Sequence, residues 1–162
     1  TSDFTLIGLP DKANPGAWSE LYEDKIARAK IEADRYEKIA EGIRKAKAEA
    51  LRNRYTLQVY EQTNNLQNYP VRLILALNDY DTAKDETARR DALETVAEVC
   101  DYFDVMRADL ESVYSETRFM QQPEGFISDL NHHNHLASKT NNSDWWYYYE
   151  IPMIRKVRAW MK

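Results

Sequence analysis

The chain has 162 residues, the size of one ordinary domain, and its four glycines and five prolines make up about half of their usual combined share. Turn-rich all-β folds, flexible linkers and glycine-rich phosphate loops need these residues, so the composition disfavours all three. Nucleic-acid-binding domains usually carry an excess of basic residues, whereas this chain has a net charge of −5. No nucleic-acid partner is therefore expected. Charged residues form 30% of the chain, which suits a soluble protein of long solvated helices.

The termini and the single cysteine limit the class of protein further. Cys100 has no second cysteine with which to form an internal disulfide or a metal knuckle. No apolar run approaches the ~18 residues of a membrane span, and no signal-peptide pattern is present. The chain begins with Thr1 instead of Met, which indicates a processed protein or a piece of a longer one.

The first predicted long helix follows an extended lead-in at residues 1–18, which holds four of the nine glycines and prolines. Ser19 is a plausible N-cap for this helix. Apolar residues then recur at alternating spacings of four and three, the pattern of a helix with one buried face. These seam residues are Tyr22, Ile26, Ala29, Ala33, Tyr36, Ala40 and Ile43. The helix either continues beyond 40 residues or breaks near Asn53.

The middle of the chain predicts two further helices. Pro70 suits the first turn of one of them, and residues 71–83 are apolar on most faces, so this helix should be the most buried. A second seam at the same alternating spacing consists of Ala92, Val96, Val99, Phe103, Met106, Leu110 and Val113. Two seams of the same form predict two long antiparallel helices packed against each other. Local charge agrees, since residues 20–54 carry ten basic and eight acidic residues and residues 79–116 carry four and twelve.

The last third of the chain is less regular. Residues 121–142 are polar and contain a turn signal at Pro123-Glu124-Gly125, so an irregular loop is expected there. A final helix should begin near Ser143 and be interrupted or kinked at Pro152. The sequence therefore predicts an all-α fold, an elongated bundle of about three to five helices over residues 19–162.

The only histidines of the chain, His132, His133 and His135, form the first candidate site. Imidazole is the commonest metal ligand near neutral pH, but helical metal pairs sit four residues apart, whereas these are one and two apart. A polar loop packed against the bundle is the favoured interpretation, with an interface, a ligand site and a metal site as alternatives. No cofactor and no metal are expected.

A run of five aromatic residues at 145–149 forms the second candidate site. Exposed aromatic rings stack on sugars and anchor interfaces, and Trp145, Trp146 and Tyr148 are the candidates for that role. Five consecutive helical residues point in all directions, however, so some of them must enter the core. Core packing is the favoured interpretation, followed by a domain interface and then by a carbohydrate platform.

Catalytic chemistry has little support in the sequence. The carboxylate pairs Asp79 with Asp81 and Asp101 with Asp104 are interpreted as solvated helix faces, because acid–base catalysis needs two carboxylates facing one cleft. Cys100 lies beside the second seam and is interpreted as a buried structural thiol. No serine nucleophile motif is present. We therefore expect no catalytic residue in this chain.

Several motifs together resemble the helical region that follows the catalytic barrel in some Bacteroidetes family 20 glycoside hydrolases, the β-N-acetylhexosaminidase group. The resemblance covers about residues 20–160. The motifs that carry it are Ala48–Tyr55, Val59–Asn64, Tyr114–Phe119, Pro123–Phe126, Asn131–His133 and Thr140–Trp145.

The resemblance implies a non-catalytic role. Enzymes of this family use an adjacent Asp-Glu pair on the barrel, and no such pair stands in a matching context here, so no catalytic residue carries over. The implied function is an accessory domain of a secreted or periplasmic enzyme acting on N-acetylhexosaminides. Its partner would be the catalytic barrel of the same parent chain, which it braces or contacts, with carbohydrate as a second partner. By itself the chain is not expected to be an enzyme.

Two alternatives from other classes remain. One is a free-standing helical protein-interaction domain that uses its seams or its aromatic segment. The other is a small carbohydrate- or metal-binding module built on the histidine cluster and the aromatic run.

Overall fold

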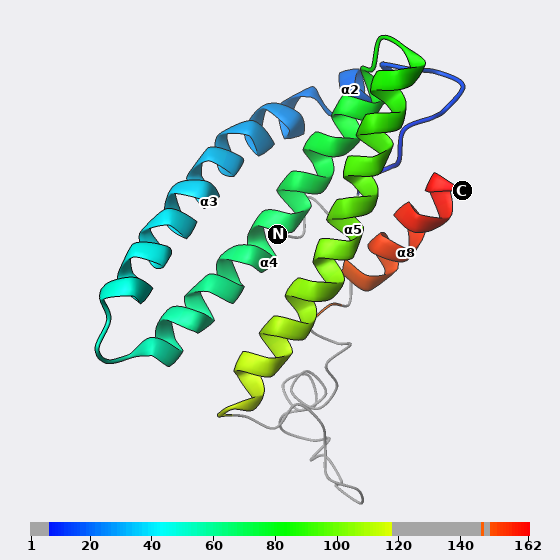
Figure 1. Cartoon of the computed structure of the whole chain (residues 1–162). Helices are drawn as coiled ribbons and strands as arrows, with labels where there is room; N and C mark the ends of the chain where they lie inside the picture. The colour runs from blue at the N-terminus through cyan, green and yellow to red at the C-terminus, as the bar shows by residue number, and fades with distance from the viewer. Residues whose placement is uncertain (1–6, 118–146, 148–149) are drawn as a thin grey trace, which may run out of the picture.

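The computed structural model describes residues 7–117, 147 and 150–162. In these residues the chain forms five helices and no strand, so the predicted all-α helical bundle is confirmed. The helices are α2 (Ala17–Leu21), α3 (Glu23–Glu49), α4 (Arg54–Asp81), α5 (Glu86–Ser115) and α8 (Glu150–Met161), shown in Figure 1. The three long helices contain 27, 28 and 30 residues, which corresponds to about 40–45 Å each.

Helix α4 is the centre of the bundle, with α3 and α5 packed on either side of it (Figure 1). Neighbouring long helices are antiparallel, so α3 and α5 run in the same direction. The expectation that the two seam helices pack against each other in antiparallel order is wrong, because α3 and α5 each pack on α4 and run in the same direction. A seam shows that a helix has a buried face, but it does not say which helix covers that face.

The ends of α3 differ in part from the sequence prediction. The break near Asn53 is confirmed, since α3 ends at Glu49 and Asn53 adopts the left-handed conformation at φ 60° before α4. Asparagine tolerates this conformation better than most residues. The prediction for Ser19 is wrong: it lies inside the short α2, whose N-cap is Gly16 at φ 88°, and its backbone N–H donates to Asp81 Oδ2 at 2.8 Å.

Pro70 does not begin a helix but lies buried in the interior of α4. An interior proline costs roughly 3 kcal/mol, because it lacks an N–H and crowds the preceding turn. The burial that follows it offsets this cost, since apolar side chains of residues 71–77 enter the core on several faces. This agrees with the expected high burial of residues 71–83. The buried apolar residues are Val71, Leu73, Ile74, Ala76, Leu77 and Tyr80.

Helix α5 buries its predicted seam almost completely. Six seam residues are buried, namely Ala92, Val96, Val99, Phe103, Met106 and Leu110, and Val113 is half-buried. Phe103 stacks at a tilt on Tyr69 of α4, with ring centroids 4.9 Å apart. The buried seam of α5 and the buried residues of α4 therefore form a large part of the core together.

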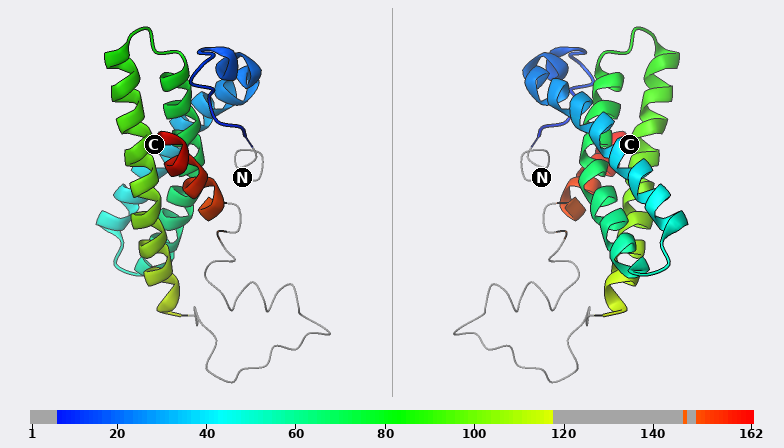
Figure 2. Two further views of the ribbon diagram at one scale, coloured as in Figure 1. Left: turned by 90° about the vertical axis from the view of Figure 1, so that its right-hand side faces the viewer. Right: turned by 90° about the vertical axis from the view of Figure 1, so that its left-hand side faces the viewer.

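One side of the α4–α5 pair is covered by α8 and by the segment of residues 7–16, which we call the N-terminal strap (Figure 2). Two indole groups hold the first residues of the strap: Trp18 Nε1 donates to the Gly8 carbonyl at 2.7 Å, and Trp160 Nε1 donates to the Pro10 carbonyl at 2.9 Å. Trp160 also meets Tyr80 edge to face at 4.8 Å. Pro152 does not interrupt α8, which continues to Met161.

Candidate functional site

The sequence-predicted site residues lie outside the described residues. This applies to His132, His133 and His135 and equally to Trp145, Trp146 and Tyr148, as it does to the expected loop at residues 121–142. Their predicted roles therefore stay predictions.

Tyr147 is the one described member of the aromatic run, and it is fully buried. Its ring meets Phe103 edge to face with centroids 6.0 Å apart, and the guanidinium of Arg107 lies 5.3 Å from its centroid. Burial raises the pKa of the Tyr147 phenol well above its usual value. For this residue the core-packing interpretation agrees with the structure.

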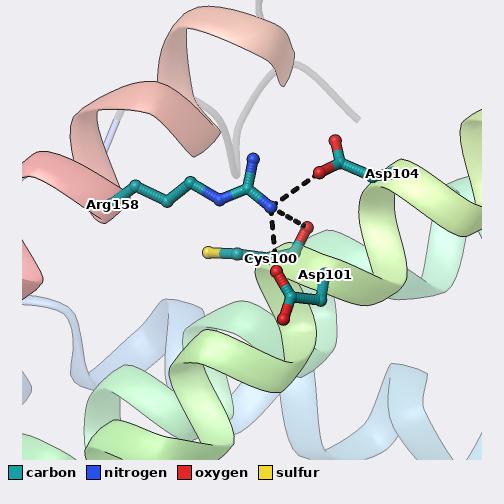
Figure 3. A network of polar contacts seen from close by, with 4 residues as sticks. All are labelled: Cys100, Asp101, Asp104 and Arg158. Atoms are coloured by element: carbon teal, nitrogen blue, oxygen red, sulfur yellow. Dashed lines mark hydrogen bonds and ion pairs between the residues drawn. The ribbon is translucent and has the colours of Figure 1, made fainter.

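Arg158 of α8 forms a network of polar contacts with α5 (Figure 3). Its Nη2 donates to Asp104 Oδ2 at 2.7 Å, to Asp101 Oδ1 at 3.0 Å and to the backbone carbonyl of Cys100 at 3.1 Å. Hydrogen bonding to Asp104 raises the pKa of Arg158 further, although partial desolvation opposes this. One guanidinium thus fastens α8 to a single turn of α5.

The geometry of this network suits the attachment of α8 to α5 and does not suit acid–base catalysis. Asp101 and Asp104 remain 80% and 55% exposed, so they agree with the solvated helix face expected from the sequence. For Asp81 that expectation is wrong, because its side chain is buried and accepts from the backbone N–H of Ser19. Both accept from the same arginine nitrogen and do not face each other across a cleft. Burial raises the pKa of the Cys100 thiol to about 11, so its reactive thiolate is scarce near neutral pH.

The outer face of α3 is a surface that the sequence interpretation did not single out. It consists of Ile31, Asp34, Arg35, Lys38 and Ile39, and it surrounds a shallow hollow. Ile31 is 71% exposed and Ile39 is 39% exposed, whereas the opposite face of α3 packs on α4. The signal was present, since both isoleucines fall between seam positions on a helix that is otherwise charged there. We call this surface the α3 outer face.

Other site types find no support in the part of the chain that the structure describes. No three His, Cys, Asp or Glu side chains there gather closely enough to hold a metal ion. Among the same residues, no helix combines the length and the apolar character needed to cross a membrane. No family model, no curated protein and no solved structure matches the chain.

Proposed function

We propose that this chain is a non-catalytic helical domain that binds a neighbouring protein surface through the α3 outer face. Given the motif resemblance, the neighbour is the catalytic barrel of a family 20-like glycoside hydrolase, which the bundle braces. The observation that carries the proposal is the exposure of Ile31 and Ile39 on a long helix that, within residues 7–117 and 150–162, packs on α4 with its opposite face.

Magnitudes favour an accessory domain over a free-standing partner-binding protein. Complete burial of an isoleucine side chain is worth about 1.5–3 kcal/mol, so Ile31 and Ile39 together supply at most a few kcal/mol. Association of two separate proteins costs an estimated 4–15 kcal/mol in lost translational and rotational freedom. A covalent linkage to the partner removes most of that cost through a high effective concentration. A small apolar contact of this kind therefore suits two domains of one polypeptide, whereas between separate proteins it supports only weak binding.

The first test is the reading frame that encodes the residues preceding Thr1. We expect it to encode a barrel with an adjacent Asp-Glu pair, and a frame without such a barrel removes the proposed role. The second test uses the full parent chain, with Ile31→Lys and Ile39→Lys combined. We expect earlier thermal unfolding of the barrel and faster protease cleavage between the two domains.

The matched control for this test is Leu51→Lys. Leu51 is 94% exposed in the turn between α3 and α4, so it tests the effect of the same substitution at an exposed apolar residue away from the α3 outer face. If the control and the double variant unfold and cleave alike, the α3 outer face does not contact the barrel.

A further inference from the structure

A shallow groove of about 610 Å³ lies between the first half of α5 and the end of α8. Its floor is apolar and consists of Leu93 and Ala97 of α5 with Met161 of α8. Leu93 and Ala97 are four residues apart on one side of α5, next to the buried seam, and both are half-buried. The groove therefore extends the apolar core of the bundle to the surface.

The rim of this groove is basic, although the chain as a whole carries a net charge of −5. Arg90, Arg158 and Lys162 line it, against the single carboxylate of Glu94. The charge of Arg158 is already engaged by Asp101 and Asp104, as described above, so Arg90 and Lys162 are the exposed cations left at the rim. An apolar floor with cations beside it complements a partner that carries apolar side chains flanked by carboxylates.

We infer that this groove binds an acidic amphipathic helix of a protein partner. A groove between two helices receives the apolar ridge of a third helix, with anchors at spacings of three and four residues. Glutamates beside that ridge lie within reach of Arg90 and Lys162. The groove is open along its length, so a single alkyl chain lying in it would leave much of its own surface in water. That geometry favours a helix over a free fatty acid. The site lies on α5 and α8 and does not depend on the α3 outer face.

The test uses the whole 162-residue chain and a fluorescent model peptide, a helix with leucine along one face and glutamate on the others. A peptide with lysine in place of every glutamate is the matched probe. We expect saturable binding of the acidic peptide, measured by anisotropy, and nuclear magnetic resonance shifts at Leu93 and Met161. Equal binding of the basic peptide, no binding at millimolar peptide, or shifts confined to other residues overturns the inference.

Charge-reversal variants of the chain test which basic residues contribute to binding of the acidic peptide. Arg90→Glu combined with Lys162→Glu should weaken binding of the acidic peptide by about three- to tenfold, because each exposed ion pair contributes little and its reversal adds repulsion. Arg155→Glu is the control, since Arg155 is an exposed cation of α8 outside the groove. An equal loss in the control shows that only general charge attraction is at work and overturns the assignment to the groove.

Two further measurements separate other occupants and the proposed function. Tighter binding of decanoate than of the peptide at the same residues assigns the groove to an amphiphile, and dimerisation blocked by Leu93→Glu assigns it to a second copy. Either result overturns the inference. Ile31→Lys on the α3 outer face should leave peptide binding unchanged, so failure of one proposal is distinguishable from failure of the other.

Discussion

Removal of the Arg158 side chain is the most direct test of how α8 is held on the bundle. In Arg158→Ala, Asp104, Asp101 and the Cys100 carbonyl lose the guanidinium that they share. The side chain of Arg158 is 37% exposed and both carboxylates are more exposed, so each ion pair deserves the surface value of about 0.2–1 kcal/mol. The backbone hydrogen bond adds about 1 kcal/mol. We expect a loss of about 1.4–3 kcal/mol in total.

This loss should loosen α8 without releasing it. Ile151, Met153, Ile154 and Val157 are all buried, and at about 1.5–3 kcal/mol each their burial far exceeds the polar contribution. Amide hydrogen exchange across α8 should therefore accelerate by about ten- to 150-fold, since 1.4 kcal/mol corresponds to a factor of ten.

The assay compares Arg158→Ala with Arg155→Ala, which removes an exposed arginine of the same helix. High salt should shrink the difference between them, because it screens exposed charges. Equal exchange rates in the two variants, or a larger effect of Arg158→Ala than of Val157→Ala, refutes the reasoning that polar contacts orient α8 and apolar burial retains it.

Three further predictions concern the backbone, the thiol and the core. Gly42→Ala should stabilise α3 by about 0.5–1 kcal/mol in thermal unfolding, because a Cβ at this position meets nothing within 4 Å. Gly16→Ala should destabilise the protein by about 1–2 kcal/mol, because Gly16 has φ 88°. A change in stability of the same sign in both variants contradicts this prediction. Burial raises the pKa of Cys100 from 9.0 to about 11, so its thiol ionises at a lower pH in the unfolded chain than in the native one. Stability should therefore fall as pH rises from about 9 to 11, and a pH titration of urea unfolding should show a smaller fall in Cys100→Ala. Phe103→Ala should cost about 3–5 kcal/mol in urea unfolding, against less than about 0.5 kcal/mol for Val105→Ala at an exposed position.

Spacing alone is enough to find α3 and α5, because a buried helix face repeats every three or four residues whatever covers it. It does not find α4 as one helix, since the sequence predicts a helix only at residues 71–83 and α4 runs from Arg54 to Asp81. The seam from Ala92 to Leu110 is buried as expected. Spacing was not enough to choose the neighbour of each seam, and the central position of α4 followed from the structure. Pro70 was misplaced for a related reason, since a local rule for proline does not register the core packing around it.

The candidate sites were less accessible to prediction. Arg158 meets Asp101 and Asp104 from more than fifty positions away along the chain, and no local pattern links them. The α3 outer face was in principle visible as isoleucines outside the seam, but exposed apolar residues are common and acquire meaning only when the opposite face is known to be buried. The histidine cluster and most of the aromatic run fall outside the described residues, so the binding and interface roles predicted for them stay predictions.

The contact between Trp160 and the N-terminal strap also constrains the order in which the chain folds. It joins Trp160 to Pro10 across 150 positions, whereas the packing of α3 on α4 and of α4 on α5 joins consecutive helices through short turns. Contacts that close long loops form slowly, because the chain loses conformational entropy before the contact contributes any favourable free energy. During synthesis the contact between Pro10 and Trp160 must therefore wait until residue 160 has been made and has left the ribosome, whereas the contact between Gly8 and Trp18 can form early. The three-helix layer is free to assemble first, and the strap and α8 complete the fold together.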